Sequence, residues 1–297
     1  MYRYFTEGVL WGRFREFIAL GTDRFSFLEK ILKDTELEYK VAAIAGNRHF
    51  FISPPRRDDV LPRRQPVILS AHYDRASGSP GANDNSAGVF LLIETAMRLR
   101  SEKENNWIII LTDKEELEEG ESILKQGSYT LAEGFKTSRM QNARIFSFDA
   151  CGTGDTLIIS TTAEHLLTGE SPGMTKLKAQ VMELQKTALE TVRELRMEKV
   201  LLMPTPFSDD AGFLRAGMAA QTITMLPREE AARLISALRK KPSIAGDLVS
   251  RKNEKIRLQP FYPETWRCMN TPSDSHLRLT PKNYPGVIRF ARGLCGI

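Results

Sequence analysis

Four short segments of the chain concentrate carboxylate and imidazole side chains, the groups that proteins use to hold divalent metal ions. The segments are "ILSAHYDR", "SPGANDNSAG", "LTDKEELEEGES" and "RIFSFDACG", and their candidate residues are His72, Asp74, Asp84, Glu115, Glu116 and Asp149. All four fall at or just after segments that we predict to be β-strands. Because ligands bind beyond the carboxyl ends of strands in α/β sheets, this position favours a functional role.

The first segment places a histidine two residues before an aspartate. In an extended chain His72 and Asp74 share a face. A histidine that binds a metal needs a second acceptor to fix its tautomer, and Asp74 is well placed for that role. Taken alone, a surface pair at the end of a strand is the simpler interpretation.

The second segment, "SPGANDNSAG", precedes a predicted helix, and Asp84 has two possible roles there. Its side chain could cap the helix that begins near Ser86. Alternatively, its two oxygens could bridge a pair of metal ions about 3.5–4 Å apart. A segment this rich in Gly, Asn and Asp is more specific than a cap requires.

The third and fourth segments supply further carboxylates at strand exits. Glu115 and Glu116 follow the apolar run "NWIIILTD", and Asp149 follows an apolar strand and precedes a glycine turn. Hydrolysis by a water nucleophile needs a metal that lowers the pKa of the water and a base that takes its proton. Adjacent glutamates can divide these roles, whereas Asp149 by itself is a weak signal.

The elements that position these residues alternate between strand and helix patterns along the chain. Predicted strands are 39–44, 49–52, 66–71, 107–112, 144–148, 157–160, 200–203 and 221–225. Predicted helices are 25–33, 86–99, 174–196, 210–216, 229–239 and 283–293. The segment 162–175 is the most loop-like internal stretch, and 240–266 is predicted to be a second excursion near the end. The alternation predicts an α/β fold, a mixed twisted sheet of about eight strands sandwiched by helices.

Composition narrows the class of protein. The chain has 297 residues, 41% hydrophobic and 27% charged, which suits one α/β domain over 1–297 with 1–65 as its N-terminal helical lead-in and first strands. Three scattered cysteines exclude a disulfide framework, and charges interrupt the first apolar run, so we predict a cytoplasmic protein. Short basic clusters mixed with acids argue against nucleic-acid binding, and no stretch reaches membrane-spanning length.

Taken together, the motifs resemble the co-catalytic zinc aminopeptidases of peptidase family M28, which also contains the glutaminyl cyclases. The resemblance runs from about Pro66 to the C-terminus. It rests on "AHYD", "PGANDNSAG", "DKEE", "FSFDACG", "FSDDAGFLRAG" and "NTPSD", which occur in the family's order. The order of "HYD" and "PGANDN", followed by "DxEE" after a buried strand, is the most specific part of the match.

The resemblance implies a phosphorylase/hydrolase-like, zinc-exopeptidase fold and a role for each site residue. One zinc ion would be held by His72, Asp84 and Asp149, and a second by Asp84, Glu116 and a C-terminal histidine. Glu115 would be the general base for the attacking water and would return the proton to the leaving amine. Asp74 and Asp209 would orient the ligands, and the substrate would be a peptide.

Two departures from the family's pattern concern the second metal ion. Asn270 stands where the family usually has histidine, and Asp210 replaces a histidine that is common after "SD". Three outcomes are open: a single zinc ion, completion of the site by His276 from a shifted loop, or a manganese or magnesium ion aided by Asp210.

We expect a metal-dependent aminopeptidase that acts on short peptides. The alternatives are a mono-zinc enzyme like the glutaminyl cyclases and a degenerate member that binds a peptide or partner without catalysis. The sequence leaves the substrate side-chain preference and the oligomeric state open.

Overall fold

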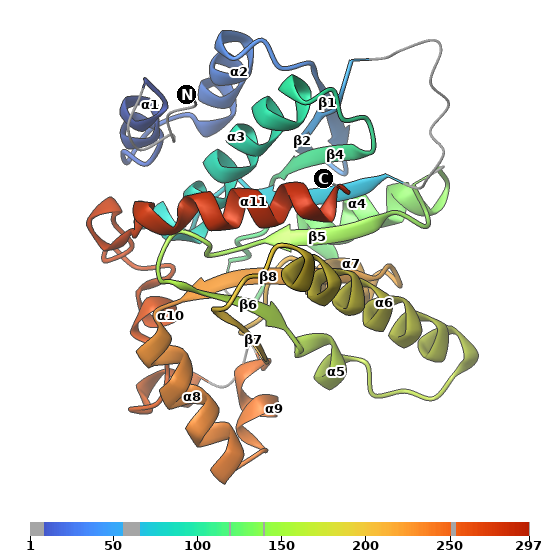
Figure 1. The fold of residues 1–297 in the computed structure, drawn as a ribbon, viewed down its shortest axis with the longest axis vertical. Helices are drawn as coiled ribbons and strands as arrows, with labels where there is room; N and C mark the ends of the chain where they lie inside the picture. The colour runs from blue at the N-terminus through green and yellow to red at the C-terminus, as the bar shows by residue number, and fades with distance from the viewer. Residues whose placement is uncertain (1–8, 56–65, 119, 139, 251–253, 297) are drawn as a thin grey trace.

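The computed structural model describes residues 9–55, 66–118, 120–138, 140–250 and 254–296. Its eight-stranded sheet runs in the order β1-β2-β4-β3-β5-β8-β6-β7 (Figure 1). The strands are β1 (Tyr39–Ile44), β2 (Asn47–Ile52), β3 (Val67–His72), β4 (Trp107–Thr112), β5 (Arg144–Phe148), β6 (Thr156–Ser160), β7 (Val200–Met203) and β8 (Ala220–Leu226). The predicted mixed sheet of about eight strands is confirmed.

The centre of the sheet is parallel and its flanks contain the antiparallel pairs. Strands β4, β3, β5 and β8 run in one direction, whereas β1, β2 and β6 introduce antiparallel pairings. The chain passes from β3 to β4 on one side and then returns to β5 on the other side of β3. Such a reversal opens a crevice at the carboxyl ends of these strands, which is where ligands bind in α/β folds.

Helices cover both faces of the sheet. They are α1 (Val9–Phe17), α2 (Arg24–Asp34), α3 (Ala87–Ser101), α4 (Gly127–Lys136), α5 (Thr162–Leu166), α6 (Pro172–Glu194), α7 (Asp210–Arg215), α8 (Arg228–Lys240), α9 (Ile244–Leu248), α10 (Glu264–Cys268) and α11 (Tyr284–Leu294). Helices α3, α11 and α6 lie across one face (Figure 1), and α4 and α7 pack on the other.

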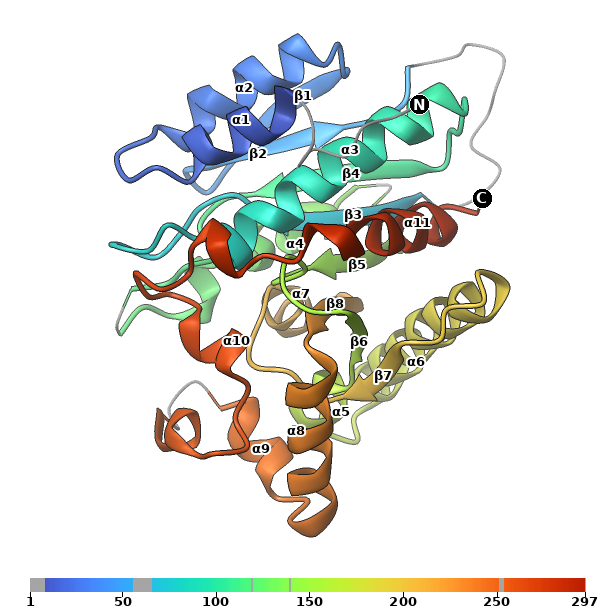
Figure 2. The ribbon, with the colours of Figure 1, turned by 60° about the vertical axis from the view of Figure 1, so that its left-hand side comes forward.

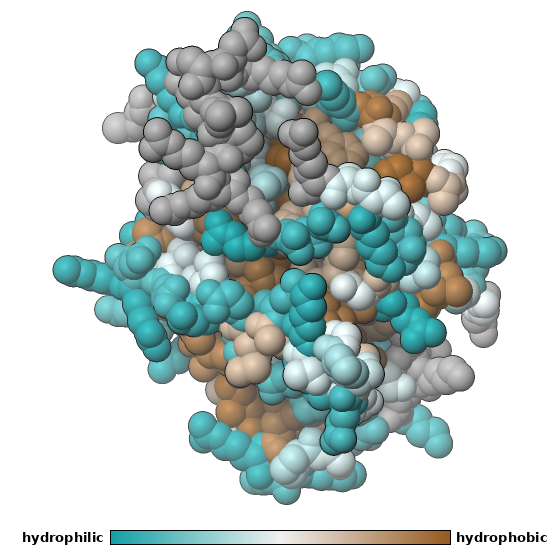
Figure 3. All heavy atoms as spheres, turned by 90° about the vertical axis from the view of Figure 1, so that its right-hand side faces the viewer, coloured by the Kyte–Doolittle hydropathy of each residue, from teal (hydrophilic) through white to brown (hydrophobic). Residues whose placement is uncertain are grey.

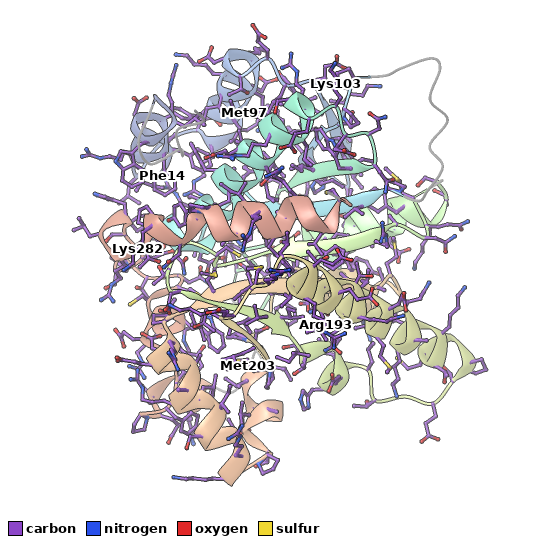
Figure 4. The ribbon with its side chains drawn as sticks, viewed as in Figure 1. Phe14, Met97, Lys103, Arg193, Met203 and Lys282 are labelled. Carbon is purple, nitrogen blue, oxygen red and sulfur yellow. The ribbon has the colours of Figure 1, made fainter. Side chains whose placement is uncertain are left out.

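The largest hydrophobic cluster joins the two ends of the described chain. It contains Phe14 of α1 and Leu294 of α11, together with inward-facing residues of the central strands. Phe14 lies beside α3, with its ring centroid 5.2 Å from that of Phe90 (Figure 4). Because each fully buried side chain of this size contributes about 1.5–3 kcal/mol, these contacts hold the N-terminal helices firmly against α3.

The sequence patterns locate all eight strands to within two residues, and the six predicted helices correspond to α2, α3, α6, α7, α8 and α11. Helices α4, α9 and α10 were not predicted, and α5 lies in a segment predicted to be a loop. Turn residues fix some of the boundaries: Asp23 caps α2 by accepting a hydrogen bond from Ser26 N, and Ser171 caps α6 before Pro172.

On the face drawn in Figure 3, hydrophilic residues surround smaller hydrophobic patches. Among the helices of the described residues, none is both long and apolar enough to cross a membrane.

Candidate metal centre

Three of the candidate ligands converge beyond the ends of β3 and β5. His72 is the last residue of β3, and its Nε2 lies 3.1 Å from Asp84 Oδ1 and 3.6 Å from Asp149 Oδ1. All three side chains are buried, and their ligand atoms lie within 4.8 Å of one another. Residues from three separate segments therefore form one compact cluster.

Asp84 is held by a network of buried hydrogen bonds rather than by helix capping. The carboxylate of Asp274 accepts hydrogen bonds from the backbone N–H groups of Asn83, at 2.8 Å, and Asp84, at 3.0 Å. Asn85 donates to the carbonyl of Phe148 at the end of β5. Ser86, and not Asp84, occupies the N-cap of α3, with no side-chain capping bond. The capping alternative for Asp84 is therefore not what the structure contains.

Asp74 connects the histidine to the glutamate loop. Its Oδ1 lies 3.3 Å from His72 Nδ1, and its Oδ2 accepts a hydrogen bond from the backbone N–H of Glu116 at 2.9 Å. Burial raises the pKa of Asp74, but the hydrogen bonds and charge of His72 and the backbone N–H groups of Glu116 and Glu115 outweigh burial and lower it. The carboxylate of Asp74 therefore lies beside the ring nitrogen of His72 that faces away from Asp84, where a group that orients the ring would lie.

Glu115 is buried and bound to the start of α4. Its Oε1 accepts a hydrogen bond from Ser128 N at 2.5 Å, and its Oε2 accepts one from Ser128 Oγ at 2.9 Å. Burial, and then the negative charges of Asp209 and Asp74, hold the pKa of Glu115 well above its usual value. A carboxyl with a raised pKa can both accept and return a proton. The sequence patterns gave no sign of Ser128, which lies in an unpredicted helix.

The cluster opens into a cavity of about 250 Å³ at the carboxyl ends of the central strands. Carboxylate side chains line one part of it: Asp84, Glu115, Glu116, Asp149 and Asp209. Burial lowers the pKa of His72, but the surrounding carboxylates, Asp209 first, outweigh it and hold that pKa well above normal. The same negative field favours a bound cation.

The second half of the expected metal site is less complete. Glu116 lines the cavity, and so does Asn270, which is exposed and has a positive φ of 61°. His276 packs with its ring centroid 6.2 Å from that of Trp11, and Asp210 is buried at the start of α7; neither belongs to the cavity lining. Of Asn270, His276 and Asp210, Asn270 is the one that lines the cavity.

Two loops of the site share one buried cation. Arg24 of α2 donates hydrogen bonds to the carbonyls of Tyr73, Asp74 and Pro80 and to Ser86 Oγ. Burial lowers its pKa to about 9. This arginine ties the segment after His72 to the segment that carries Asp84. Sequence reasoning assigned no role to the first 65 residues and so missed it.

The residues present fit one divalent ion. Zinc binds histidine nitrogen and carboxylate oxygen at about 2.0–2.2 Å, so neighbouring ligand atoms 3.1 and 3.6 Å apart suit a shared ion. Within the described residues, Asp149 Oδ1 is buried without a hydrogen-bond partner and faces His72. Among these residues, the His72, Asp84 and Asp149 group is the one cluster of three ligands with this geometry.

The chain belongs to peptidase family M28, whose family model matches residues 56–265. The fold is shared with a zinc-dependent exopeptidase from Parabacteroides distasonis, with a TM-score of 0.60, 14% identity and 97% coverage of both chains. It is also shared with glutaminyl cyclase from Porphyromonas gingivalis, with a TM-score of 0.59, 16% identity, and coverage of 96% of this chain and 94% of that one. No curated protein matches the chain by sequence.

A zinc aminopeptidase from Bacillus subtilis has the same fold, with a TM-score of 0.53 and 19% identity over 83% of this chain. The match covers 48% of that enzyme, so the chain spans about half the length of this relative. At these identities the solved structures establish the fold, and the family match establishes membership of peptidase family M28.

Proposed function

We propose that the chain is a metal-dependent aminopeptidase that hydrolyses the N-terminal peptide bond of short peptides. The observation that carries the proposal is the placement of the His72, Asp84 and Asp149 cluster and Glu115 on one cavity. A ligand triad beside a buried carboxyl is the arrangement that metal-assisted hydrolysis requires.

The proposed chemistry divides between the ion and the chain. A bound zinc ion lowers the pKa of water and polarises a carbonyl oxygen. Glu115 accepts the proton of the attacking water and returns it to the leaving amine, while Ser128 holds its carboxylate in place. His72, Asp84 and Asp149 hold the ion, Asp74 orients His72, and Glu116 supports a weaker second site for zinc, manganese or magnesium.

The test uses the purified chain with aminoacyl-chromogen substrates and added zinc, cobalt or manganese. Turnover that depends on the metal and disappears with chelator is the expected result. A folded, metal-loaded chain without turnover under every metal would overturn the proposal. A chain that retains less than about 0.1 metal ion, and binds none on titration, would instead indicate a non-catalytic binding protein.

One observation favours a second candidate, cyclisation of N-terminal glutamine. The single-ion geometry of the cluster, with Glu115, Asp149 and Asp209 on the same cavity, suits a mono-zinc enzyme. The overlap with the Porphyromonas gingivalis enzyme also covers almost the whole of both chains. We rank cyclisation second because Asn270 replaces the C-terminal histidine on which the zinc of the cyclases relies. A dipeptide with N-terminal glutamine separates the two reactions. Hydrolysis by an aminopeptidase releases free glutamine, whereas cyclisation releases ammonia and leaves the peptide bond intact.

We further propose that residues 1–297 form a single metallopeptidase-like domain that works in the cytoplasm on peptide substrates. The shared hydrophobic cluster of α1 and α11 supports one domain. Three buried cysteines without disulfide partners suit a reducing compartment.

A further inference from the structure

The cavity beside the metal centre has two chemically different walls. One consists of the carboxylates at the strand ends. The other comes from the segment that follows α8 and contributes Leu248, Ile256, Arg257, Tyr262 and Trp266. In Figure 2 this segment, with α9 and α10, lies on the same side of the molecule as the loops that follow β3 and β4. The cavity therefore joins an acidic end to an aromatic and aliphatic end.

Arg257 is the one lysine or arginine among the described residues that line this cavity. It lies in the 3₁₀ turn Glu254–Leu258, is half-buried, and donates one hydrogen bond from Nη2 to the carbonyl of Met269 at 3.2 Å. Within the described part of the chain it forms no ion pair. A guanidinium carries five N–H donors, so most of its donors remain to bind a ligand.

The turn that carries Arg257 is itself fixed. The carbonyl of Arg257 accepts a hydrogen bond from Arg267 Nε at 2.9 Å, and Ile256 is buried in the cluster that contains Trp266. Arg267 in turn pairs with Glu264 of α10. A cation held on a braced turn costs little conformational entropy when it binds a carboxylate, and guanidinium and carboxylate match in geometry.

The charges of the two walls complement a short peptide. Its N-terminal ammonium is attracted to the carboxylates, and a negative group further along is attracted to Arg257. The volume of about 250 Å³ lies below the roughly 300–1,000 Å³ of pockets for drug-sized ligands, so the cavity suits a compact ligand.

We propose that Arg257 binds a carboxylate on the residue that follows the scissile bond, so that the enzyme prefers dipeptides with a free C-terminus or an acidic second residue. The preference rests on the proposed aminopeptidase function. The C-terminus of a dipeptide and an acidic side chain at its second residue present the same group to Arg257, a carboxylate.

The experiment compares three dipeptides, using the zinc-loaded full-length chain. They are leucyl-alanine, leucyl-alaninamide and leucyl-glutamate amidated at its C-terminus, whose side-chain carboxylate is free. We expect kcat/KM for at least one of the two carboxylate compounds to exceed that of the neutral amide by roughly 10- to 100-fold, mainly through KM. The acid and the glutamate compound tell the two sources of the carboxylate apart.

Two arginine variants test the assignment. Arg257→Gln should reduce the ratio of kcat/KM between the carboxylate compound and the amide to within a few-fold, and Arg257→Lys should retain part of it. Lys255→Gln, which removes an exposed cation of the same turn that does not line the cavity, should preserve the ratio. A ratio that survives in Arg257→Gln, or no preference in the unaltered chain, would overturn the proposal.

A failure of the peptidase function can be recognised separately. The same three compounds are titrated calorimetrically into the zinc-loaded Glu115→Gln chain, where no turnover is required. Tighter binding of a carboxylate compound, lost in the Arg257→Gln, Glu115→Gln double variant, supports the role of Arg257 even without hydrolysis. Equal binding of all three compounds contradicts it.

Discussion

The two halves of the carboxylate cluster differ in how firmly the fold fixes them. His72 ends a buried strand, and buried hydrogen bonds hold the other two ligands. The backbone N–H of Asp84 donates to the carboxylate of Asp274, and the hydroxyl of Ser208 donates to the carboxylate of Asp149. Asn270, at the other half, is exposed on a turn. A metal site is only as strong as the rigidity and the donor strength of its ligands, so the first half should bind an ion tightly and the second weakly.

The sharpest test of the first half changes the base and keeps the ligands. Glu115→Gln keeps the shape but removes the acceptor of the proton, so we expect kcat to fall by about 10²- to 10⁴-fold. Elemental analysis should find the zinc content unchanged, because Glu115 is not one of the three clustered ligands. Full activity in Glu115→Gln would contradict the assignment.

The next largest effect is expected from Asp274, which holds the backbone of the segment that carries Asp84. Asp274→Ala removes the acceptor of two backbone N–H groups at Asn83 and Asp84, and we expect zinc affinity to weaken by roughly 10- to 100-fold. Competition with a chelator measures this affinity. Asp155→Ala is the matched control, because Asp155 also accepts a backbone N–H, from Arg228, but lies away from the cavity. Equal losses in the two variants would mean general destabilisation.

The second half can be strengthened. Asn270 has a φ of 61°, a region that histidine tolerates better than most residues, so Asn270→His should raise zinc content from one ion per chain toward two. Asn270→Gly accepts the same backbone geometry without a ligand and should stay at one ion. Two ions in the unaltered chain would show that the two halves are equal after all.

The smallest expected effect concerns the orientation of Glu115. Ser128→Ala removes the Oγ hydrogen bond but keeps the backbone one, so kcat should fall by only about 2- to 10-fold. Ser138→Ala, just beyond the other end of α4, should leave kcat unchanged because the hydroxyl of Ser138 bonds the carbonyl of Phe135 and the N–H of Met140 and does not line the cavity. A loss as large as that of Glu115→Gln would place Ser128 in the chemistry itself.

The sequence predicted best where the physical signal is local. A run such as Trp107–Thr112 is buried almost throughout, and its apolar composition alone identifies a central strand. Helix α4 was not predicted because Gly127 and Gly134 weaken its helix pattern. The structure nevertheless requires glycine at position 127, because a Cβ there would lie 1.7 Å from the carbonyl oxygen of Asp113.

The residues of the candidate site were also predicted best where the sequence signal is local. His72, Asp84 and Asp149 lie next to strong strand and turn signals, and the order of the strands in the sheet brings them together. Ser128, Arg24 and the support from Asp274 depend on contacts between residues 13 to 191 positions apart. Single-sequence periodicity carries no information at that range, so these partners required the structure.

Arg24 lies outside the segment 56–265 that the family model matches, yet it bonds to both loops that carry ligands. A fragment cut at the boundaries of that match would keep His72, Asp84 and Asp149 but lose the cation between their loops. The two loops would then carry carbonyl groups that lack their buried donor, and assembly of the metal centre would depend on the part of the chain with no recognised motif. The limits of a sequence family are therefore not the limits of the unit that must fold before this site can exist.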